Sequence, residues 1–226
     1  MYFIKSIYSN PHKNGRAACA FRRKSLQSSQ MKREIKNIRI AMSIFDRDGS
    51  RIFAGSVKGK QVFSALVEQT DTPNVPTRLL LDFTDIDVAT GSFLRESVYA
   101  YRTHARSQWP FLYPVIANAS GNIVEELNMC LEPRSDAMIS VTVNESGEVS
   151  KSLLIGSLDG KQRDAMRVVI ERQEVDAPTL ARDSNESATT WNNRLAALAS
   201  KGLIVEQSLG RSKLYFPLVE GLKYGP

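Results

Sequence analysis

The sequence predicts an α/β domain with a mixed sheet and covering helices, followed by a smaller α+β domain of three helices and a hairpin. In the first part of the chain, short apolar segments alternate with amphipathic ones, which is the order of strands and helices in an α/β domain. From Gly160 to Leu218, three amphipathic segments precede two apolar strands around a turn. We therefore divide the chain into residues 1–30, 31–156 and 157–226.

The basic charge of the chain is concentrated in residues 1–30. This segment carries six lysines and arginines and no acid, whereas residues 31–226 carry 24 basic and 24 acidic residues. The net charge of +6 therefore does not predict nucleic-acid binding by the folded part. We expect residues 1–30 to be a disordered extension, translated from an upstream start codon. A basic arm on DNA or RNA and a targeting peptide are the alternatives.

Composition excludes several classes of protein. No apolar run approaches the roughly 18 residues that a membrane span needs, so we expect no membrane association. The two cysteines and two histidines have no spacing typical of zinc ligands, and we expect no metal and no other cofactor. One thiol in each region favours a reducing, cytoplasmic compartment. Cys130 follows Leu127 at helical spacing, which predicts a small core residue.

The first elements expected after residue 31 are a hairpin and a helix. Residues 35–45 alternate as a strand does, Asp48-Gly49 is a hairpin signal, and residues 51–55 would be the return strand. Residues 60–69 then show the periodicity of a helix. The apolar face of this helix would carry Val62, Phe63, Leu66 and Val67.

The next segments predict a sheet that is buried on both faces. Residues 78–83 form a continuous apolar run, as in a strand with helices on both sides. A helix is expected over residues 89–106, with Phe93, Val98 and Tyr101 sharing much of one face. The remaining elements are a strand over 113–119, a helix between its expected N-cap Ser120 and Pro133, strands over 137–143 and 149–155, and a hinge over 156–160.

The last part of the chain has the element order of a winged helix, a fold whose common role is DNA binding. Trp191, Leu195 and Leu198 are spaced i, i+4 and i+7, so they form the stripe that would seat the third helix on the first two. Their expected partners are Met166, Val169, Ile170 and Leu180.

The opposite face of the third helix is small and polar, with Ser187 as its expected N-cap. Backbone N–H groups at such a helix start bind phosphate, Asn pairs with adenine, and Arg pairs with guanine. Basic residues at a hairpin tip are suited to phosphate or minor-groove contact. The candidate DNA-binding residues are Ser187, Thr189, Thr190, Asn192, Asn193 and Arg194 on the helix, and Arg211 and Lys213 at the tip.

The stretch SATTWNNRLAALASKGLIVEQSLGRSKLYFPL resembles the recognition helix and wing of winged-helix regulators of the MarR type. The shared pattern is a helix ending in Leu198-x-x-Lys201-Gly202-Leu203-Ile204, followed by a strand, a Gly/Arg turn and a returning strand. The resemblance implies that Gly202 ends the helix and that Leu203 and Ile204 re-enter the core. The long dimerisation helices of that family have no counterpart here, so whether the chain forms a homodimer stays open.

Protein docking is the alternative role for this domain, because winged helices also serve as docking modules. Residues 151–226 carry 11 basic and 9 acidic residues, whereas a strong DNA binder usually has a more basic face.

The stretch LLLDFTDIDVATGSFLRESV resembles STAS domains, the fold of anti-sigma-factor antagonists. The closer similarity is to STAS-like domains of unassigned function, which have a strand ending in Asp, a spacer, and a Ser-Phe-Leu helix start before a Glu. Here these are Asp82, Ser92-Phe93-Leu94 and Glu96, and the resemblance covers roughly residues 35–145. It implies binding of a partner protein or a sensing role.

In the antagonists the helix starts with Asp-Ser-Ser-Gly, and the first serine is phosphorylated. The corresponding residues here are Thr90, Gly91, Ser92 and Phe93, so a glycine occupies the phosphorylated position. Thr90 or Ser92 could substitute, and Ser92 is equally explained as a residue that starts a helix. The possible regulatory residues are therefore Asp82, Thr90 and Ser92.

No catalytic set is recognisable, and we expect the chain not to be an enzyme. Asp82, Asp85 and Asp87 could hold a divalent ion at a sheet edge, but such acids more often cap a helix start or solvate a loop. We therefore expect a cytoplasmic bacterial regulator that binds double-stranded DNA with its second domain and a protein partner with its STAS-like domain. The alternative is a protein-docking adaptor in a signalling or defence module.

Overall fold

A computed structural model of the chain describes residues 35–144, 146–210 and 212–224. The chain divides into two units, residues 1–34 and 35–226, and all the described residues belong to the second unit. The predictions for residues 1–30 and for Arg211 lie outside the described residues.

The described elements alternate between strands and helices up to Gly156, and three helices and further strands come after it. In order they are β1 (Lys36–Ala41), a 3₁₀ turn (Met42–Phe45), β2 (Ile52–Phe53), α2 (Ser56–Glu68), β3 (Thr77–Asp82), β4 (Val88–Ala89), α3 (Gly91–Leu94), a π-helical segment (Arg95–Tyr99), α4 (Ala100–Gln108), β5 (Leu112–Ala117), α5 (Gly121–Leu131), a 3₁₀ turn (Glu132–Arg134), β6 (Ala137–Val143), β7 (Val149–Gly156), α6 (Gly160–Arg172), α7 (Ala177–Asp183), α8 (Ala188–Lys201), β8 (Ile204–Leu209), β9 (Ser212–Pro217) and β10 (Lys223–Tyr224).

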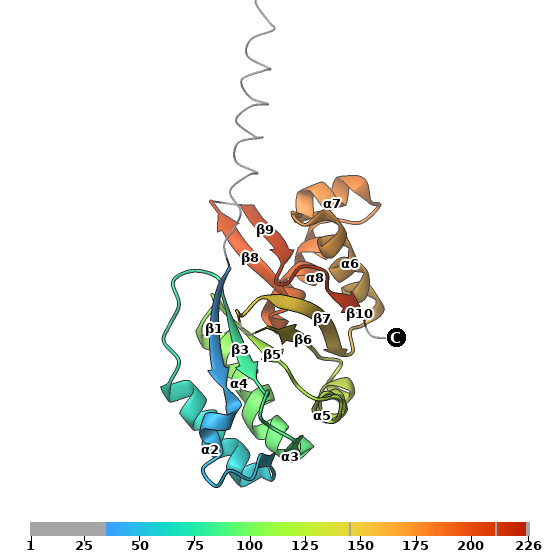
Figure 1. Cartoon of the computed structure of the whole chain (residues 1–226). Coiled ribbons are helices and arrows are strands. Elements are labelled where there is room, and N and C mark those ends of the chain that lie inside the picture. The colour runs from blue at the N-terminus through green and yellow to red at the C-terminus, as the bar shows by residue number, and fades with distance from the viewer. Residues whose placement is uncertain (1–34, 145, 211, 225–226) are drawn as a thin grey trace, which may run out of the picture. The chain divides into compact units, whose positions relative to one another are not determined.

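A mixed sheet organises this unit, as the sequence predicts for an α/β fold (Figure 1). Its strand order is β1-β3-β5-β6-β7-β10. The first four strands are parallel, and β7 runs antiparallel to β6. Strand β10, near the end of the chain, pairs in parallel with β7. The C-terminal part therefore completes the sheet that the N-terminal part begins.

Each face of the sheet is covered by a different set of helices. Leu79 and Leu81 of β3 pack in a cluster with buried residues of α2 to α5. Leu80 points to the opposite face and shares its cluster with α6, α7, α8 and the β8–β9 hairpin. A strand covered on both faces needs a continuous apolar sequence, which confirms the prediction for residues 78–83.

The predicted N-terminal hairpin is wrong. β2 does not return along β1 but pairs in parallel with β4 in a separate two-stranded sheet. After β1 a 3₁₀ turn redirects the chain, and the Asp46 carboxylate accepts a hydrogen bond of 2.7 Å from the Arg51 backbone N–H. Phe53 is then buried, with its ring stacked on Phe93 at 4.8 Å. Core packing of one aromatic residue has overridden the Asp-Gly hairpin signal.

The long helix predicted over residues 89–106 is present from Gly91 to Gln108, with a π-helical segment in its middle. Phe93, Val98 and Tyr101 are all buried, as predicted, and so is Cys130 on α5. Ser120 stands at the N-cap position of α5, but its side chain makes no capping hydrogen bond.

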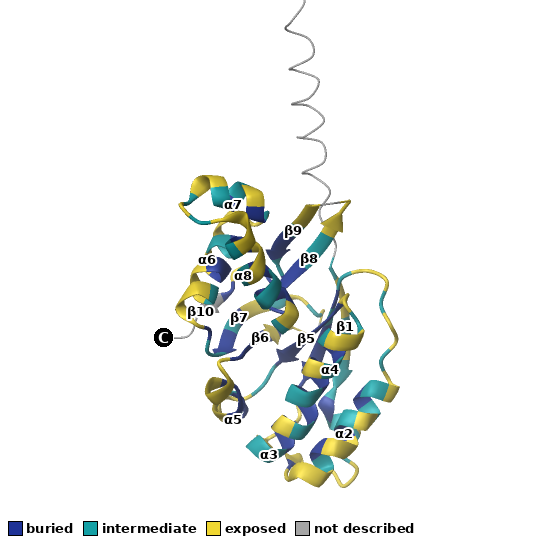
Figure 2. Cartoon of the chain, turned by 180° about the vertical axis from the view of Figure 1, so that it is seen from behind, coloured by how far each residue is buried: buried dark blue, intermediate teal, exposed yellow. Residues whose placement is uncertain are grey.

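The element order predicted for the last part of the chain is confirmed: α6, α7 and α8 precede the β8–β9 hairpin. Trp191, Leu195 and Leu198 are buried in one cluster with Met166, Val169 and Leu180, and Ile170 packs against it. Gly202 ends α8 with a φ of +77°, and Leu203 and Ile204 return to the core. Figure 2 shows the buried stripe of these helices turned inward and the exposed face turned outward.

Buried polar contacts join α8 to the N-terminal part of the unit. Asp136, before β6, pairs with Arg102 of α4 and accepts a 3.1 Å hydrogen bond from the Lys201 Nζ of α8. Arg106 donates to the Ala199 carbonyl of α8 at 3.1 Å. The segment expected to be a hinge, residues 156–160, is also bonded to this region: the Ser157 N–H donates a hydrogen bond of 2.9 Å to the Asp136 carbonyl. We call Arg102, Asp136 and Lys201 the junction cluster.

Candidate nucleic-acid interface

The start of α8 is built by its N-cap, as predicted. The Ser187 hydroxyl accepts a 3.1 Å hydrogen bond from the Thr190 backbone N–H. The hydroxyls of Ser187 and Thr190 also lie 3.0 Å apart. These two side chains fix the first turn of the helix. Their hydroxyls are thereby partly engaged within the protein.

Three of the predicted contact residues are exposed on the outer face of α8: Thr189, Asn192 and Asn193. The Asn192 side-chain carbonyl accepts from the Tyr215 hydroxyl of β9 at 3.3 Å, which links the helix to the hairpin. Within the described residues, Asn193 makes no side-chain hydrogen bond, so both its amide donors and its acceptor are available.

Arg194 is held by an acid that the sequence analysis did not identify. Both of its terminal nitrogens donate to the Glu186 carboxylate, one of them at 2.6 Å, and Lys161 lies 3.9 Å from the same carboxylate. The hydrogen bond from Arg194 lowers the pKa of Glu186, and the hydrogen bond to Glu186 raises the pKa of Arg194. The Arg194 guanidinium also lies over the Trp191 ring at 5.3 Å. Arg194 is therefore only 14% exposed and does not stand free on the helix face.

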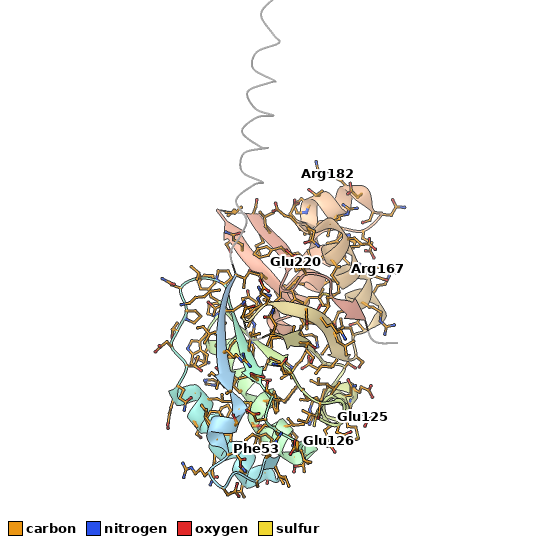
Figure 3. All side chains as sticks on the ribbon, in the orientation of Figure 1. Phe53, Glu125, Glu126, Arg167, Arg182 and Glu220 are labelled. Atoms are coloured by element: carbon orange, nitrogen blue, oxygen red, sulfur yellow. The ribbon has the colours of Figure 1, made fainter. Side chains whose placement is uncertain are left out.

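In the β8–β9 hairpin, too, a predicted cationic contact is paired with an acid. Lys213 of β9 forms an ion pair of 2.7 Å with Glu206 of β8. In both views the hairpin turn and α7 lie at the same end of the unit (Figures 1 and 2). Arg182 of α7 points outward at that end (Figure 3), where its guanidinium donates to the Thr179 hydroxyl at 3.0 Å.

Among the described residues, the interface is consequently polar, and its main cations are paired with acids. Of the predicted cationic contacts, Arg194 and Lys213 are both paired with acids of the same face. Arg167, on the outer surface of α6, pairs with Asp164 (Figure 3). Phosphate would have to compete with these carboxylates, whereas the Asn193 amide is not engaged by any described residue.

Asp82 is the centre of a separate network at the carboxyl ends of the parallel strands. It pairs with Arg39 of β1 and accepts hydrogen bonds from the Thr84 hydroxyl at 2.7 Å and from the Asn118 amide at 2.9 Å. Burial by itself would raise the pKa of Asp82, but the hydrogen bonds from Thr84, Asn118 and Arg39 outweigh it and lower the pKa. A cavity of about 250 Å³ borders this carboxylate.

The other two regulatory candidates lie at the start of α3 and have structural partners. The Thr90 hydroxyl accepts from the Phe93 N–H at 3.4 Å and from the Gly55 N–H at 3.2 Å. Its oxygen lies 3.2 Å from the Ser92 hydroxyl. Among the described residues, neither hydroxyl contacts Asp82, so the three candidates do not form a single site.

The acids that come after β3 do not converge. Asp87 pairs with Arg51 at 2.9 Å, and the Arg51 side chain also donates to the Asp85 backbone carbonyl at 3.0 Å. In the part of the chain that the structure describes, no group of three His, Cys, Asp or Glu side chains is placed to hold a metal ion.

Comparison with protein-family models finds no match, and comparison with curated proteins finds no significant similarity. Of the helices between residues 35 and 224, none combines the length and the apolar character needed to traverse a lipid bilayer.

Replacing Asp82 with alanine is expected to lower the free energy of unfolding by about 1–3 kcal/mol near neutral pH, because it removes the charged acceptor that Arg39, Thr84 and Asn118 share. The folded-state pKa of Asp82 is lowered from 3.8, so its contribution is present above that value and is lost as the pH falls through the lowered pKa. The deficit should therefore shrink in acid. Urea unfolding at about pH 7 and about pH 3 measures it. Asp85→Ala, at an exposed position, is the matched control, and a deficit that does not change with pH would contradict the assignment.

Proposed function

We propose that this chain is a DNA-binding transcriptional regulator in which α8 is the recognition helix and the β8–β9 hairpin is the wing. The observation that carries the proposal is the exposed polar face of α8, with Thr189, Asn192 and Asn193 opposite the buried Trp191 and Leu195. A helix of this polarity can enter the major groove and contact phosphate with its first N–H groups. The resemblance of this stretch to MarR-type regulators supports the same role.

The pairing of Arg194 and Lys213 with acids shapes the kind of binding we propose. Affinity for phosphate alone should be modest, because Arg194 and Lys213, the described cations of the predicted contact set, are both paired. Base contacts by the exposed amides would then carry a large share of the specificity. Palindromic DNA would require a homodimer, since each copy supplies a single α8.

We propose that the STAS-like part receives the signal, from a protein partner or a ligand, and that the chain acts in the bacterial cytoplasm, where DNA is accessible. We propose no catalytic role for the chain, and we interpret its buried Asp82 and Asp136 carboxylates, which pair with basic side chains, as structural.

Replacing Asn193 with alanine is expected to weaken DNA binding by about tenfold, because an amide that pairs with adenine contributes about 1–3 kcal/mol of discrimination. The full chain would be titrated by fluorescence anisotropy onto the DNA upstream of its own gene, at several salt concentrations. The substitution should reduce affinity without changing the salt slope, since no charge is lost.

The matched control is Asn122→Ala, an exposed asparagine on α5. It should leave DNA affinity unchanged. If the full chain binds no DNA in a salt-dependent manner, or if both substitutions weaken binding equally, the regulator proposal fails.

A protein-docking adaptor is the second candidate function. The observation that favours it is the pairing of each described cation in the predicted DNA-binding set with an acid: Arg194 with Glu186 and Lys213 with Glu206. A near-neutral polar face suits protein contacts better than phosphate. Absence of DNA binding together with protein capture that Asn193→Ala abolishes would favour the adaptor.

A further inference from the structure

Besides the cavity at Asp82, a larger cleft lies at the carboxyl ends of β5 and β6. Its volume is about 440 Å³, and it runs between α5 and the sheet and along the outer edge of β7. Ala119 and Val124 form the wall on the α5 side, and Glu220 and Gly221 border the other end. The residues that line the cleft come from outside α8, β8 and β9, so the cleft is distinct from the proposed DNA-binding surface. Ligands of α/β proteins commonly bind at the carboxyl ends of parallel strands.

The strand register places polar and apolar side chains next to one another in this cleft. Thr142 of β6 lies opposite Lys151 of β7, and Ser140 lies opposite Leu153. Residues opposite each other in a ladder point to the same face, and the four alternate positions therefore form one surface. Val124 of α5 faces the same cleft. One part of the surface thus offers hydroxyls and an ammonium group, and another offers aliphatic side chains.

Ser140 indicates that the cleft is suited to a polar ligand group. It lines the cleft, is 8% exposed, and makes no side-chain hydrogen bond within the described residues. The neighbouring hydroxyls are used internally: Ser150 donates to the Thr142 carbonyl and Ser152 to the Glu220 carbonyl, each at 3.2 Å. The Ser140 hydroxyl is therefore open to the cleft and available to donate a hydrogen bond to a ligand group there.

The charge of the cleft favours an anionic group. Lys151 forms no ion pair with any described residue, and its ammonium group is therefore available. Glu220 is the acid at the rim, and Arg78 lies near enough to interact with its charge. Ammonium and hydroxyl donors together are typical of sites that bind carboxylate or phosphate.

We propose that this cleft binds a small molecule in which one anionic group is joined to an apolar part. The anionic group accepts hydrogen bonds from Lys151, Ser140 and Thr142, and the apolar part packs on Val124 and Leu153. The two parts of the cleft fix the orientation of the ligand, because the anionic group would be poorly bound on the aliphatic side chains and the apolar part poorly bound at the hydrogen-bond donors. The proposal does not depend on DNA binding.

Titration of the full chain with phenyl phosphate and with phenylacetate, followed by ¹H–¹⁵N NMR, tests the proposal and distinguishes phosphate from carboxylate. At least one of the two should show saturable shifts at residues of the cleft. Lys151→Gln should weaken that binding by about tenfold, and Ser140→Ala by several-fold, because each removes one donor to the anion. Benzyl alcohol, which lacks the charge, should bind at least about tenfold more weakly.

Lys60→Gln, at an exposed lysine of α2, is the matched control and should leave affinity unchanged. Absence of saturable binding by both anionic probes would overturn the proposal, as would binding that neither Lys151→Gln nor Ser140→Ala weakens. Asn193→Ala should bind the probes like the unaltered chain, so failure here and failure of the DNA-binding proposal are separate results.

Discussion

Replacing Asp136 with alanine is expected to destabilise the unit of residues 35–226 by about 3–5 kcal/mol, the usual cost of leaving buried charges without a partner. Asp136 is 8% exposed and pairs with both Arg102 and Lys201, so its loss leaves two cations facing each other in a poorly hydrated site. Its carboxylate also accepts the Ala137 N–H at 2.8 Å. Urea denaturation followed by circular dichroism measures the change in the free energy of unfolding.

Asp164→Ala is the matched control for this experiment. Asp164 also pairs with an arginine, Arg167, but both side chains are more than half exposed, so its loss should cost less than about 1 kcal/mol. Similar losses for the two variants would show that the junction cluster contributes no more than a surface ion pair.

The shape of the same unfolding curves tests how the two parts of the unit are joined. Sheet residues such as Val115 and Ile139 share one buried cluster with Leu195 and Leu198 of α8. We therefore expect one cooperative transition for residues 35–226. Two separate transitions would show that α6 to β9 unfolds independently of the sheet.

Replacing Glu186 with glutamine is expected to strengthen DNA binding by about tenfold, provided that α8 is the recognition helix. The substitution removes the carboxylate that holds Arg194, so this cation becomes available to phosphate. One further charge-assisted hydrogen bond to phosphate accounts for a change of this size. The salt dependence should steepen by about one counterion, which anisotropy titrations over a range of salt concentrations would measure.

Glu171→Gln on α6 removes the same charge at an exposed position and serves as the control. It should change affinity much less than Glu186→Gln does. If Glu186→Gln leaves affinity unchanged or lowers it, Arg194 is a structural residue that supports the start of α8. It would then not be one of the α8 residues that contact DNA.

The prediction of helices and strands was correct where the pattern of apolar residues extended over a whole element. The apolar run of residues 78–83 and the spacing of Trp191, Leu195 and Leu198 both indicated how those segments are buried. Such patterns are visible in the sequence because each residue's face is set by its position along the element. The hairpin after β1 failed because the burial of Phe53 against Phe93, 40 residues away, decided the path of the chain.

The candidate interface was predicted less completely. The exposure of Asn193 and the capping by Ser187 depend on local spacing, and both were expected. Glu186 was missed because it precedes the helix and reaches Arg194 from outside the i, i+4 pattern. The cleft beside Ser140 had no signal either, since its surface comes from β6, β7 and α5 together.

The sequence by itself determined the order of helices and strands, the caps of the last helix and the apolar side of most elements. These depend on interactions between residues a few positions apart. Only the tertiary structure decided which charges meet, from Glu186 with Arg194 to Asp136 with Lys201, 65 residues further along the chain. Electrostatic pairing depends on distance and burial across elements, and these are defined once the sheet has brought both parts of the chain together.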